Sequence, residues 1–569
     1  MRPIDWLAVT ILLLFAAALR IIGIGFGQPN PEYFPSYAPF GMVHEHLAVH
    51  PDEFLNVSIP VNMSLRNRLN PEFFNYPSFI INSNFVLFRL TGSLDELSLA
   101  DREGRNLRNY AGHHLYVISR MYSVVGGMIA LASCYAITRL LSGRYAALCA
   151  GLLVASCFTF VQHAHYIKPG SLAVGWMTLA TWASVVALYN SRPASRIRFY
   201  MLAGALTGLA ATTRYNALAV APFVFAVGLI LLYRHRSAAM FRAVIIAWLM
   251  IPIVFFAGSP YILRDFGHFL NDFSWIVGQY VSSGADLPRF FLVDHWTGMF
   301  YQLLFIPIFG IGVPAVICAI ASIAACWRRR GGYTGPQMRY ILRHDSFLLC
   351  VGLIWFTIVL YALVALRTIR PGHSDHHIML ILPFIILLSA ISADWLVRRL
   401  SLPSRIAMPA VALILVIQPL VLSVQVVKVF SQPDTRYIML EWIHTNIPGG
   451  ARFFLNGSYN VPLDNALYPN FAHNLSYASA LPDGSEYDYL IYSDSKAFDV
   501  IRSQSIVPAE IVEAERAYLR ELDAAFHRVA EIHRPLWTGS EAMMNMASYW
   551  HNPTLIVYCL NRLSCEKHR

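Results

Sequence analysis

Long apolar stretches recur over the first 428 residues of this 569-residue chain, and they limit its fold more than any other feature. Many reach the roughly 18 residues that a helix needs to cross a ~30 Å hydrocarbon core. Lipid offers no partners to backbone N–H and C=O groups, so such spans are helical. Only 13% of the residues are charged, whereas soluble domains carry about 25%. We predict eleven spans, at about 4–26, 116–138, 145–162, 170–189, 199–213, 216–233, 241–258, 298–326, 346–366, 377–396 and 405–428.

The positive charges in the short connections give these spans an orientation. Lys and Arg concentrate in cytoplasmic loops, so we place the arginine-rich side in the cytoplasm. The loops at 27–115 and near 163–169, 259–297 and 367–376, with the tail from about 429, then lie outside. The arginines on the cytoplasmic side are Arg139, Arg144, Arg192, Arg196, Arg198, Arg234, Arg236, Arg242, Arg328, Arg329, Arg330, Arg339, Arg343, Arg398, Arg399 and Arg405.

Composition divides the chain into two regions. Residues 1–428 form a transmembrane domain, whose 27–115 loop carries amphipathic surface helices near 52–65 and 76–90. Residues 429–569 turn soluble and predict helices at 434–447 and 508–529 and strands at 452–455, 489–492 and 555–560. The expected fold is therefore an all-α polytopic membrane protein with a small C-terminal extracytoplasmic α/β domain. In that tail, Cys559 and Cys565 either pair or remain free thiols.

Two adjacent carboxylates, Asp52 and Glu53, follow the first apolar run by about 25 residues. One interpretation is structural, because Pro51 with acids in the first turn is a common helix start. The other is catalytic, because acids beside a membrane exit can act at the water–lipid boundary. Which of the two interpretations applies depends on the other side chains that lie on the outer face of the membrane.

Cationic side chains gather on that outer face. Ionisable groups at membrane depth are costly and usually face a cavity or a partner. A carboxylate that deprotonates an acceptor hydroxyl, with cations that stabilise a phosphate leaving group, is a chemistry that suits this set. The cations are Arg120, Arg214, Arg367, Arg370, His373, His376 and His377.

In their order and topology, several motifs resemble the membrane glycosyltransferases of the GT-C fold, specifically the protein O-mannosyltransferases and the aminoarabinose transferase of lipid A. The resemblance covers most of the chain. Its motifs are His50-Pro51-Asp52-Glu53, Asn70-Pro71-Glu72-Phe73-Phe74-Asn75-Tyr76-Pro77, Ser119-Arg120-Met121-Tyr122-Ser123, Thr213-Arg214-Tyr215-Asn216, Gly258-Ser259-Pro260-Tyr261, His376-His377-Ile378-Met379-Leu380, and Asp434-Thr435-Arg436 with Glu441-Trp442-Ile443.

The resemblance implies a polyprenyl- or dolichyl-phosphate sugar as donor, and it implies roles for individual residues. Asp52 and Glu53 take the acidic catalytic role, one of them as base. Arg120 matches a basic residue that contacts the donor phosphate, and we place Arg214 near the same phosphate, with snorkelling at a span end as its alternative. The other candidates are His376 and His377, which match a position at the head of a late helix, Arg370 and His373 by proximity, and His50 and Tyr261 within the matched motifs.

One segment departs from the family pattern. After the third span the family often has an acid, and here Gly170 stands in that place. His163 or His165 could substitute for it, or the role is absent. Asp265 is a second outer acid, with helix capping as its alternative role.

A bound metal is not expected. His44, His46, His50 and Asp52 have the composition of a Zn²⁺ site, but histidines in a long polar loop more often bind no metal. The sequence has no Gly-rich phosphate loop or dinucleotide fingerprint, and no sizeable cytoplasmic domain for a nucleotide-sugar. The net charge of +10 lies in loop arginines rather than in a nucleic-acid surface.

The sequence thus predicts an inverting glycosyltransferase that moves a sugar from a lipid phosphate to an acceptor hydroxyl at the extracytoplasmic face. We expect a bacterial inner membrane, with the endoplasmic reticulum membrane as the alternative. The acceptor is open between protein, lipid and polymer. A transporter or flippase of a lipid-linked sugar is the alternative, although we find no internal repeat of the kind that transporters often have. A non-catalytic scaffold is the third interpretation.

Overall fold

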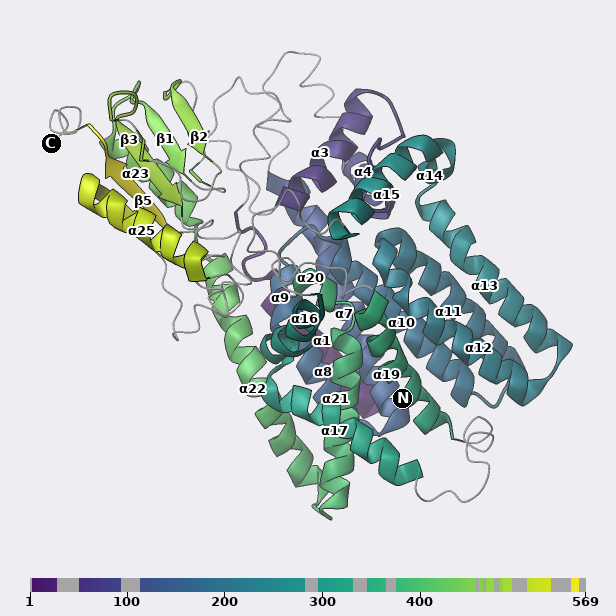
Figure 1. Cartoon of the computed structure of the whole chain (residues 1–569). Helices are drawn as coiled ribbons and strands as arrows, with labels where there is room; N and C mark the ends of the chain where they lie inside the picture. Colours follow the sequence, from purple (N-terminus) through teal and green to yellow (C-terminus); the bar gives the residue numbers. More distant parts are fainter. Residues whose placement is uncertain are drawn as a thin grey trace.

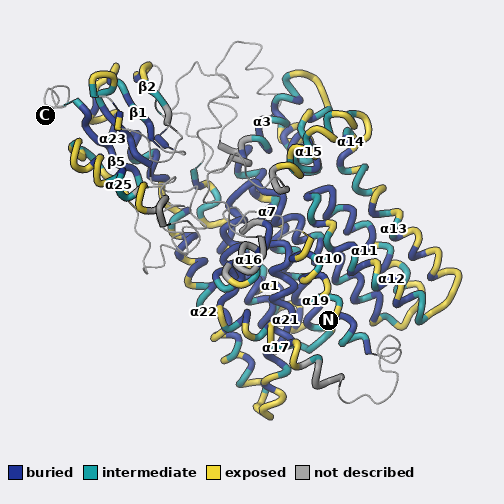
Figure 2. Tube along the Cα trace, viewed as in Figure 1, coloured by how far each residue is buried: buried dark blue, intermediate teal, exposed yellow. Residues whose placement is uncertain are grey.

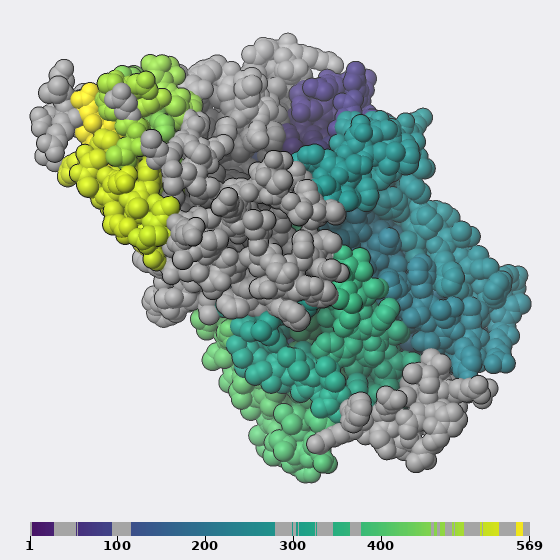
Figure 3. All heavy atoms as spheres, in the orientation of Figure 1, coloured from purple at the N-terminus to yellow at the C-terminus, as the bar shows by residue number. Residues whose placement is uncertain are grey.

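The computed structural model describes residues 3–27, 51–93, 113–281, 295–330, 345–364, 375–456, 460–461, 463, 467–474, 481–482, 484–493, 509–533 and 554–561. Most of them form one helical bundle, and a smaller domain at the C-terminal end lies at one corner of the molecule (Figures 1 and 3). The statements below concern these residues.

Seven helical segments of the described chain are long and apolar enough to cross a membrane. Two more helices, α11 (Pro193–Thr213) and α21 (Leu382–Arg399), pack among them. The predicted helical membrane architecture is therefore confirmed. The seven segments are α1 (Pro3–Ile21), α7 (His113–Leu141), α10 (Pro169–Tyr189), η2 (Tyr215–Val220) with α12 (Ala221–His235), α13 (Ala238–Gly258), α19 (Ser346–Val364) and α22 (Ser404–Phe430).

Two of the predicted spans are each broken into two α-helices well inside their bounds. The 145–162 range forms α8 (Arg144–Ser156) and the short α9 (Phe158–His163), which are separated at Cys157. The 298–326 range forms α16 (His295–Ile311) and α17 (Val313–Arg330), separated at Gly312 with φ +92°. A positive φ favours glycine and ends an α-helix. The prediction of one continuous span over each range was wrong.

The break after α8 is stabilised by a buried arginine that the sequence analysis did not single out. Arg20, near the end of α1, donates from Nη2 to Val154 O at 2.8 Å and from Nη1 to Ala155 O at 3.0 Å. These carbonyls belong to the last turn of α8, where no helical N–H follows to bond them. Arg20 therefore caps the interrupted helix inside the bundle.

Small residues let the central helices approach closely. A Cβ added to Gly175 of α10 would lie 2.8 Å from the carbonyl oxygen of Gly126 on α7. On α11, Gly204 and Gly208 face the backbone of α13 at Ala247 and Ile251. The hydrophobic effect does not drive helices together within lipid. Close backbone approach of this kind therefore matters, because it provides the van der Waals contact that holds the helices together.

Polar contacts mark the two ends of the bundle. At one end Arg139 Nε lies 3.4 Å from Asp5 Oδ1, and Arg398 Nη2 donates to Ser142 O at 2.9 Å. Arg120 lies on the same α7 as Arg139, roughly 28 Å away at 1.5 Å per residue. The predicted cytoplasmic residues Arg139 and Arg398 thus share one end, and Arg120 lies at the other.

Four helices cover the end that contains Arg120. They are α3 (Pro51–Leu65), α4 (Phe79–Leu90), α14 (Tyr261–Arg264) and α15 (Phe266–Val281), at the top of Figure 1. The predicted surface helices at 52–65 and 76–90 correspond to α3 and α4. We call this the outer end, after the orientation that the sequence predicts.

The C-terminal domain contains a five-stranded sheet of order β2-β1-β3-β5-β4. β1 pairs in parallel with β2 and β3, whereas β5 pairs antiparallel with β3 and β4. Three strands match the predictions, and two were missed; residues 527–529 were wrongly assigned to a helix. The strands are β1 (Phe453–Asn456), β2 (Phe471–Asn474), β3 (Tyr489–Ser493), β4 (His527–Ile532) and β5 (Leu555–Cys559).

Helices cover both faces of this sheet. On one face α23 (Thr435–Asn446) packs Met439 and Ile443 against Phe453 of β1. On the other, α25 (Ala509–Ala525) packs Tyr518 and Leu522 in the cluster that includes residues of β3 and β5. The central strands are accordingly buried, and α25 is exposed on its outer side (Figure 2). Cys559 is disulfide-bonded; Cys565 lies outside the described residues.

Candidate active site

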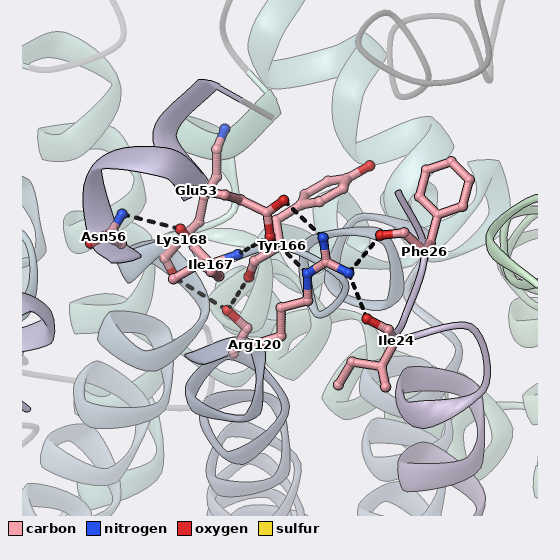
Figure 4. A network of polar contacts seen from close by, with 9 residues as sticks. Ile24, Phe26, Glu53, Asn56, Arg120, Tyr166, Ile167 and Lys168 are labelled. Carbon is pink, nitrogen blue, oxygen red and sulfur yellow. Dashed lines mark hydrogen bonds and ion pairs between the residues drawn. The ribbon is translucent and has the colours of Figure 1, made fainter. Parts of the chain in front are cut away.

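A buried ion pair joins α3 to α7 at the outer end of the bundle. Arg120 Nε donates to Glu53 Oε1 at 2.8 Å, and Arg120 Nη2 donates to Glu53 Oε2 at 2.9 Å. Neither side chain has any exposed surface. The expected meeting of the acidic segment with an arginine of a later helix therefore occurs (Figure 4).

Backbone groups complete the coordination of both partners. Arg120 Nη1 donates to Ile24 O at 2.6 Å and to Phe26 O at 2.7 Å, just after α1. Glu53 Oε1 also accepts the N–H of Ile167 at 2.9 Å. Burying two ions costs several kcal/mol each, and these charge-assisted bonds offset that cost. The pair thus ties α3, α7, the exit of α1 and the turn before α10 together.

A chain of amide and hydroxyl groups supports this junction. Asn56 Nδ2 donates to Ile167 O, and Asn84 Nδ2 donates to Asn56 O. Ser119 Oγ, beside Arg120, donates to Asn84 Oδ1 at 3.1 Å. These contacts fix α3 and α4 against α7. The start of α3, where Asp52 precedes Glu53, is therefore held at the outer end.

The turn between α9 and α10 brings further polar residues to this place. Ser123 Oγ contacts the carbonyl oxygens of Tyr166 and Lys168, at 2.7 and 3.2 Å. The ring nitrogens of His165 lie 2.8 Å from Val161 O and 2.9 Å from Ile22 O, so that His165 links the turn to the exit of α1. His163 is buried and makes an edge contact with Tyr166.

A second cluster lies where α11 ends, beside α19 and the short α20 (Asp375–Ile378). Arg214 Nη2 lies 3.2 Å from His377 Nδ1, and Asn216 Nδ2 lies 3.3 Å from the same nitrogen. Tyr361 OH donates to His377 O at 2.9 Å. Arg214 and His377 are both buried. Two of the predicted site residues, Arg214 and His377, are thus in direct contact.

Gly170 connects the turn before α10 to this second cluster. A Cβ at Gly170 would lie 3.0 Å from Arg214 Nη1 and 2.5 Å from Met379 Cε. Where the resemblance led us to expect an acid, the backbone therefore lies close against the Arg214 guanidinium. A carboxylate side chain at this position would displace Met379 or Arg214.

Asp265 and Tyr261 lie in a different part of the outer end. Asp265 Oδ2 accepts from Asn70 Nδ2 at 2.7 Å and lies 3.6 Å from His268 Nδ1. Tyr261 begins α14, and its ring lies 6.0 Å from the guanidinium carbon of Arg264. The structure joins Asp265 to the motif at 70–77 rather than to Glu53.

Several predicted residues cannot be placed. His44, His46, His50, Arg367, Arg370 and His373 lie outside the described residues. The side chains of Asp52 and His376 are also outside the description, although their backbones begin α3 and lie in α20 (Asp375–Ile378). Among the described residues, no cluster of His, Cys, Asp and Glu is arranged to hold a metal.

The sequence analysis missed several residues in and beside the two clusters, among them Lys168, Asn216 and Tyr361. Lys168 is buried in the turn before α10, and its side chain points away from Arg120 in Figure 4. Asn216 and Tyr361 contact each other at 3.3 Å beside His377. Asn216 stands within a quoted motif, and Lys168 lies between His165 and Gly170 in the sequence, so their proximity to Arg214 and Gly170 was the available signal. Tyr361 gave none, because it is one aromatic residue in an apolar span.

Residues 112–263 match the family described as dolichyl-phosphate-mannose-protein mannosyltransferase. The matched stretch contains Arg120, His163, His165, Arg214 and Tyr261. The resemblance expected from the sequence is confirmed over these residues. No curated protein matched the chain.

Solved structures with weak similarity were also found. ArnT from Cupriavidus metallidurans bound to undecaprenyl phosphate is 13% identical, with a TM-score of 0.45, covering 99% of each chain. The Archaeoglobus fulgidus oligosaccharyltransferase with Zn and sulfate is 13% identical, with a TM-score of 0.44, covering 90% of this chain and 70% of that one. The archaeal oligosaccharyltransferase AglB from the same organism, in complex with an inhibitory peptide and a dolichol-phosphate, is 12% identical, with a TM-score of 0.43, covering 93% and 73%.

Proposed function

We propose that this chain is an integral-membrane glycosyltransferase that moves a sugar from a polyprenyl- or dolichyl-phosphate carrier to an acceptor hydroxyl. The observation that carries the proposal is the enclosed Glu53–Arg120 pair, which fixes the neighbouring Asp52 at the outer end of a membrane bundle. The family match of residues 112–263 supports the same class of reaction.

The two acids have different roles in this proposal. Glu53 accepts three N–H donors and has no exposed surface, so three of its roughly four acceptor sites are engaged. Asp52 is then the base. Its carboxylate takes the acceptor proton as the acceptor oxygen bonds to the anomeric carbon, while the bond from that carbon to the phosphate oxygen breaks. Attack and departure on opposite faces invert the anomeric centre. Glu53 is a positioning residue.

The roles of the cations change accordingly. The resemblance assigned Arg120 to the donor phosphate, but four of its N–H groups are engaged by Glu53, Ile24 and Phe26. We assign Arg120 to holding Glu53, and we assign the leaving phosphate to Arg214 and His377. Lys168 is an additional candidate. A cation such as Arg214 in a partly dry site stabilises developing charge more strongly than it does in water.

The orientation and the acceptor are also proposals. Arg139 and Arg398 mark the cytoplasmic end, so Asp52 and the C-terminal domain lie outside the cytoplasm. We retain a bacterial inner membrane as the location. The acceptor hydroxyl belongs to a protein, a lipid or a polymer. We assign no step of this mechanism to a divalent metal.

The test uses the purified full-length chain in lipid nanodiscs with a donor labelled in both sugar and lipid. A glycosyltransferase releases free polyprenyl phosphate when an acceptor is present. A flippase, the alternative, leaves the donor intact, and in liposomes it moves the label across the bilayer. The proposal is overturned if the donor stays intact with each class of acceptor and the label also crosses the bilayer.

A further inference from the structure

The surface helix α15 is fixed to the protein by one face. Asp272 Oδ2 accepts the backbone N–H of Phe74 at 2.7 Å, and Asp265, just before the helix, accepts from Asn70. The ring of Phe74 makes edge contacts with His268 and Phe269, at centroid distances of 5.6 and 6.3 Å. These contacts set the rotation of α15 about its own axis.

A second face of α15 is apolar and exposed. Its large side chains continue from α14 at spacings of three and four residues, which places most of them on one side of a helix. The other exposed positions, Gly267, Asn271, Ser274 and Gly278, carry no charge. A helix that faced water would have charged side chains here. The exposed apolar residues, with their exposed fractions, are Leu263 59%, Phe266 52%, Leu270 44%, Phe273 36%, Trp275 58% and Val277 40%.

The position of α15 in the chain places it at the membrane boundary. The membrane helix α13 ends at Gly258, and only the single turn of α14 separates it from α15. Four helical residues rise about 6 Å, which is close to the thickness of one headgroup layer. In Figure 1, α15 follows the α14 turn at the end of α13 and runs across the outer end of the bundle. The outer surface of α13 is itself apolar and exposed, as at Leu249 and Ile253.

We propose that α14 and α15 lie in the outer-leaflet interface, with the apolar stripe of α15 in the boundary between headgroups and acyl chains. A Trp such as Trp275 is favoured at this depth, and the exposed Arg264 is placed to meet lipid phosphates. The stripe continues the lipid-facing surface of α13, which favours lipid over a second protein chain as its occupant. The bilayer thereby anchors the 70–76 segment through Asp272 and Phe74.

Depth-dependent quenching tests this placement in the full-length protein. A fluorophore is attached to Leu270→Cys in nanodiscs that contain lipids with a nitroxide near the headgroup or deep in the chain. Ile253→Cys on α13 is the control within the bilayer. Leu481→Cys, an exposed apolar residue of the C-terminal domain, is the control in water. Unsubstituted protein labelled in parallel gives the background from native thiols.

We expect shallow nitroxides to quench the Leu270 label at least twofold more than deep ones, with little quenching at Leu481. A label at Leu270 that is quenched no more than the one at Leu481 overturns the proposal. If, in addition, light scattering finds a dimer that Leu270→Glu converts to monomers, the stripe is covered by a second copy instead.

Discussion

At the scale of single residues, the outer end depends on an ion pair that has no access to water. Glu53 and Arg120 each give up hydration, and the two parallel hydrogen bonds and three backbone contacts offset that loss. Removal of one partner leaves the other as an uncompensated buried charge. The effect of mutation therefore depends on whether the charges are removed singly or together.

A double-mutant cycle tests this coupling. We expect Arg120→Met alone to destabilise the protein by about 3–5 kcal/mol, because it strands the Glu53 carboxylate. Glu53→Gln combined with Arg120→Met should cost less than Arg120→Met alone. Thermal unfolding midpoints of the three variants and wild type in one detergent give the comparison. A double variant no more stable than Arg120→Met would contradict the coupling.

At the scale of elements, the bundle depends on close backbone contact between α7 and α10, and the tail depends on ion pairs at the edge of its sheet. Gly126 and Gly175 have no side chain to move aside, so a methyl group at Gly175 must separate the helices. In the tail, Arg528 of β4 binds Asp523 of α25 at 2.6 Å, and Tyr558 of β5 donates to the same carboxylate at 2.9 Å.

Alanine at Gly175 should destabilise the bundle by about 1–3 kcal/mol, as overpacking does in a rigid core. Gly352→Ala on α19 is the matched control, because a Cβ there meets nothing within 4 Å. Its higher helix propensity should leave stability unchanged or slightly raised. The measurement is again the thermal unfolding midpoint. Equal midpoints for the two variants would show that close contact between α7 and α10 at Gly175 does not limit stability.

Lowering the pH should reduce the stability of the C-terminal domain, because Asp523 becomes protonated. The hydrogen bond from Arg528 lowers the pKa of the Asp523 carboxyl below its ordinary value. A group whose pKa is lower in the folded state stabilises the fold above its unfolded pKa, near 4, and this contribution is lost as the pH falls below that value.

The midpoint difference between wild type and Asp523→Asn should therefore narrow as the pH falls from 6 to 3. Glu521→Gln, an exposed acid on the same helix, should follow wild type throughout. If the difference in midpoint between wild type and Asp523→Asn stays constant with pH, the ion pair between Asp523 and Arg528 does not stabilise the domain.

At the scale of the whole molecule, the sequence predicted what depends on local pattern. Apolar runs located the membrane helices, and three central strands followed from their apolar residues. β2 and β4 were missed because they are the two edges of the sheet, and β4 keeps exposed positions that obscure its pattern.

The sequence predicted which end of the bundle holds the site residues, but not which of these residues contact one another. Charge and order placed Glu53, Arg120, Arg214 and His377 at the outer end. Which pairs meet depends on contacts between residues 67 and 163 positions apart in the chain. The breaks at Cys157 and Gly312 depend on tertiary contacts such as those of Arg20, which hydrophobicity does not encode.

The most direct measurement compares turnover of Asp52→Asn with that of wild type and Glu521→Gln, using saturating lipid-linked donor and a defined acceptor. Loss of a positioned base typically costs about 10²–10⁴ in rate. We predict a loss in that range for Asp52→Asn with an unchanged unfolding midpoint, and wild-type turnover for Glu521→Gln. Turnover of Asp52→Asn within a few-fold of wild type would contradict the assignment of Asp52 as the base.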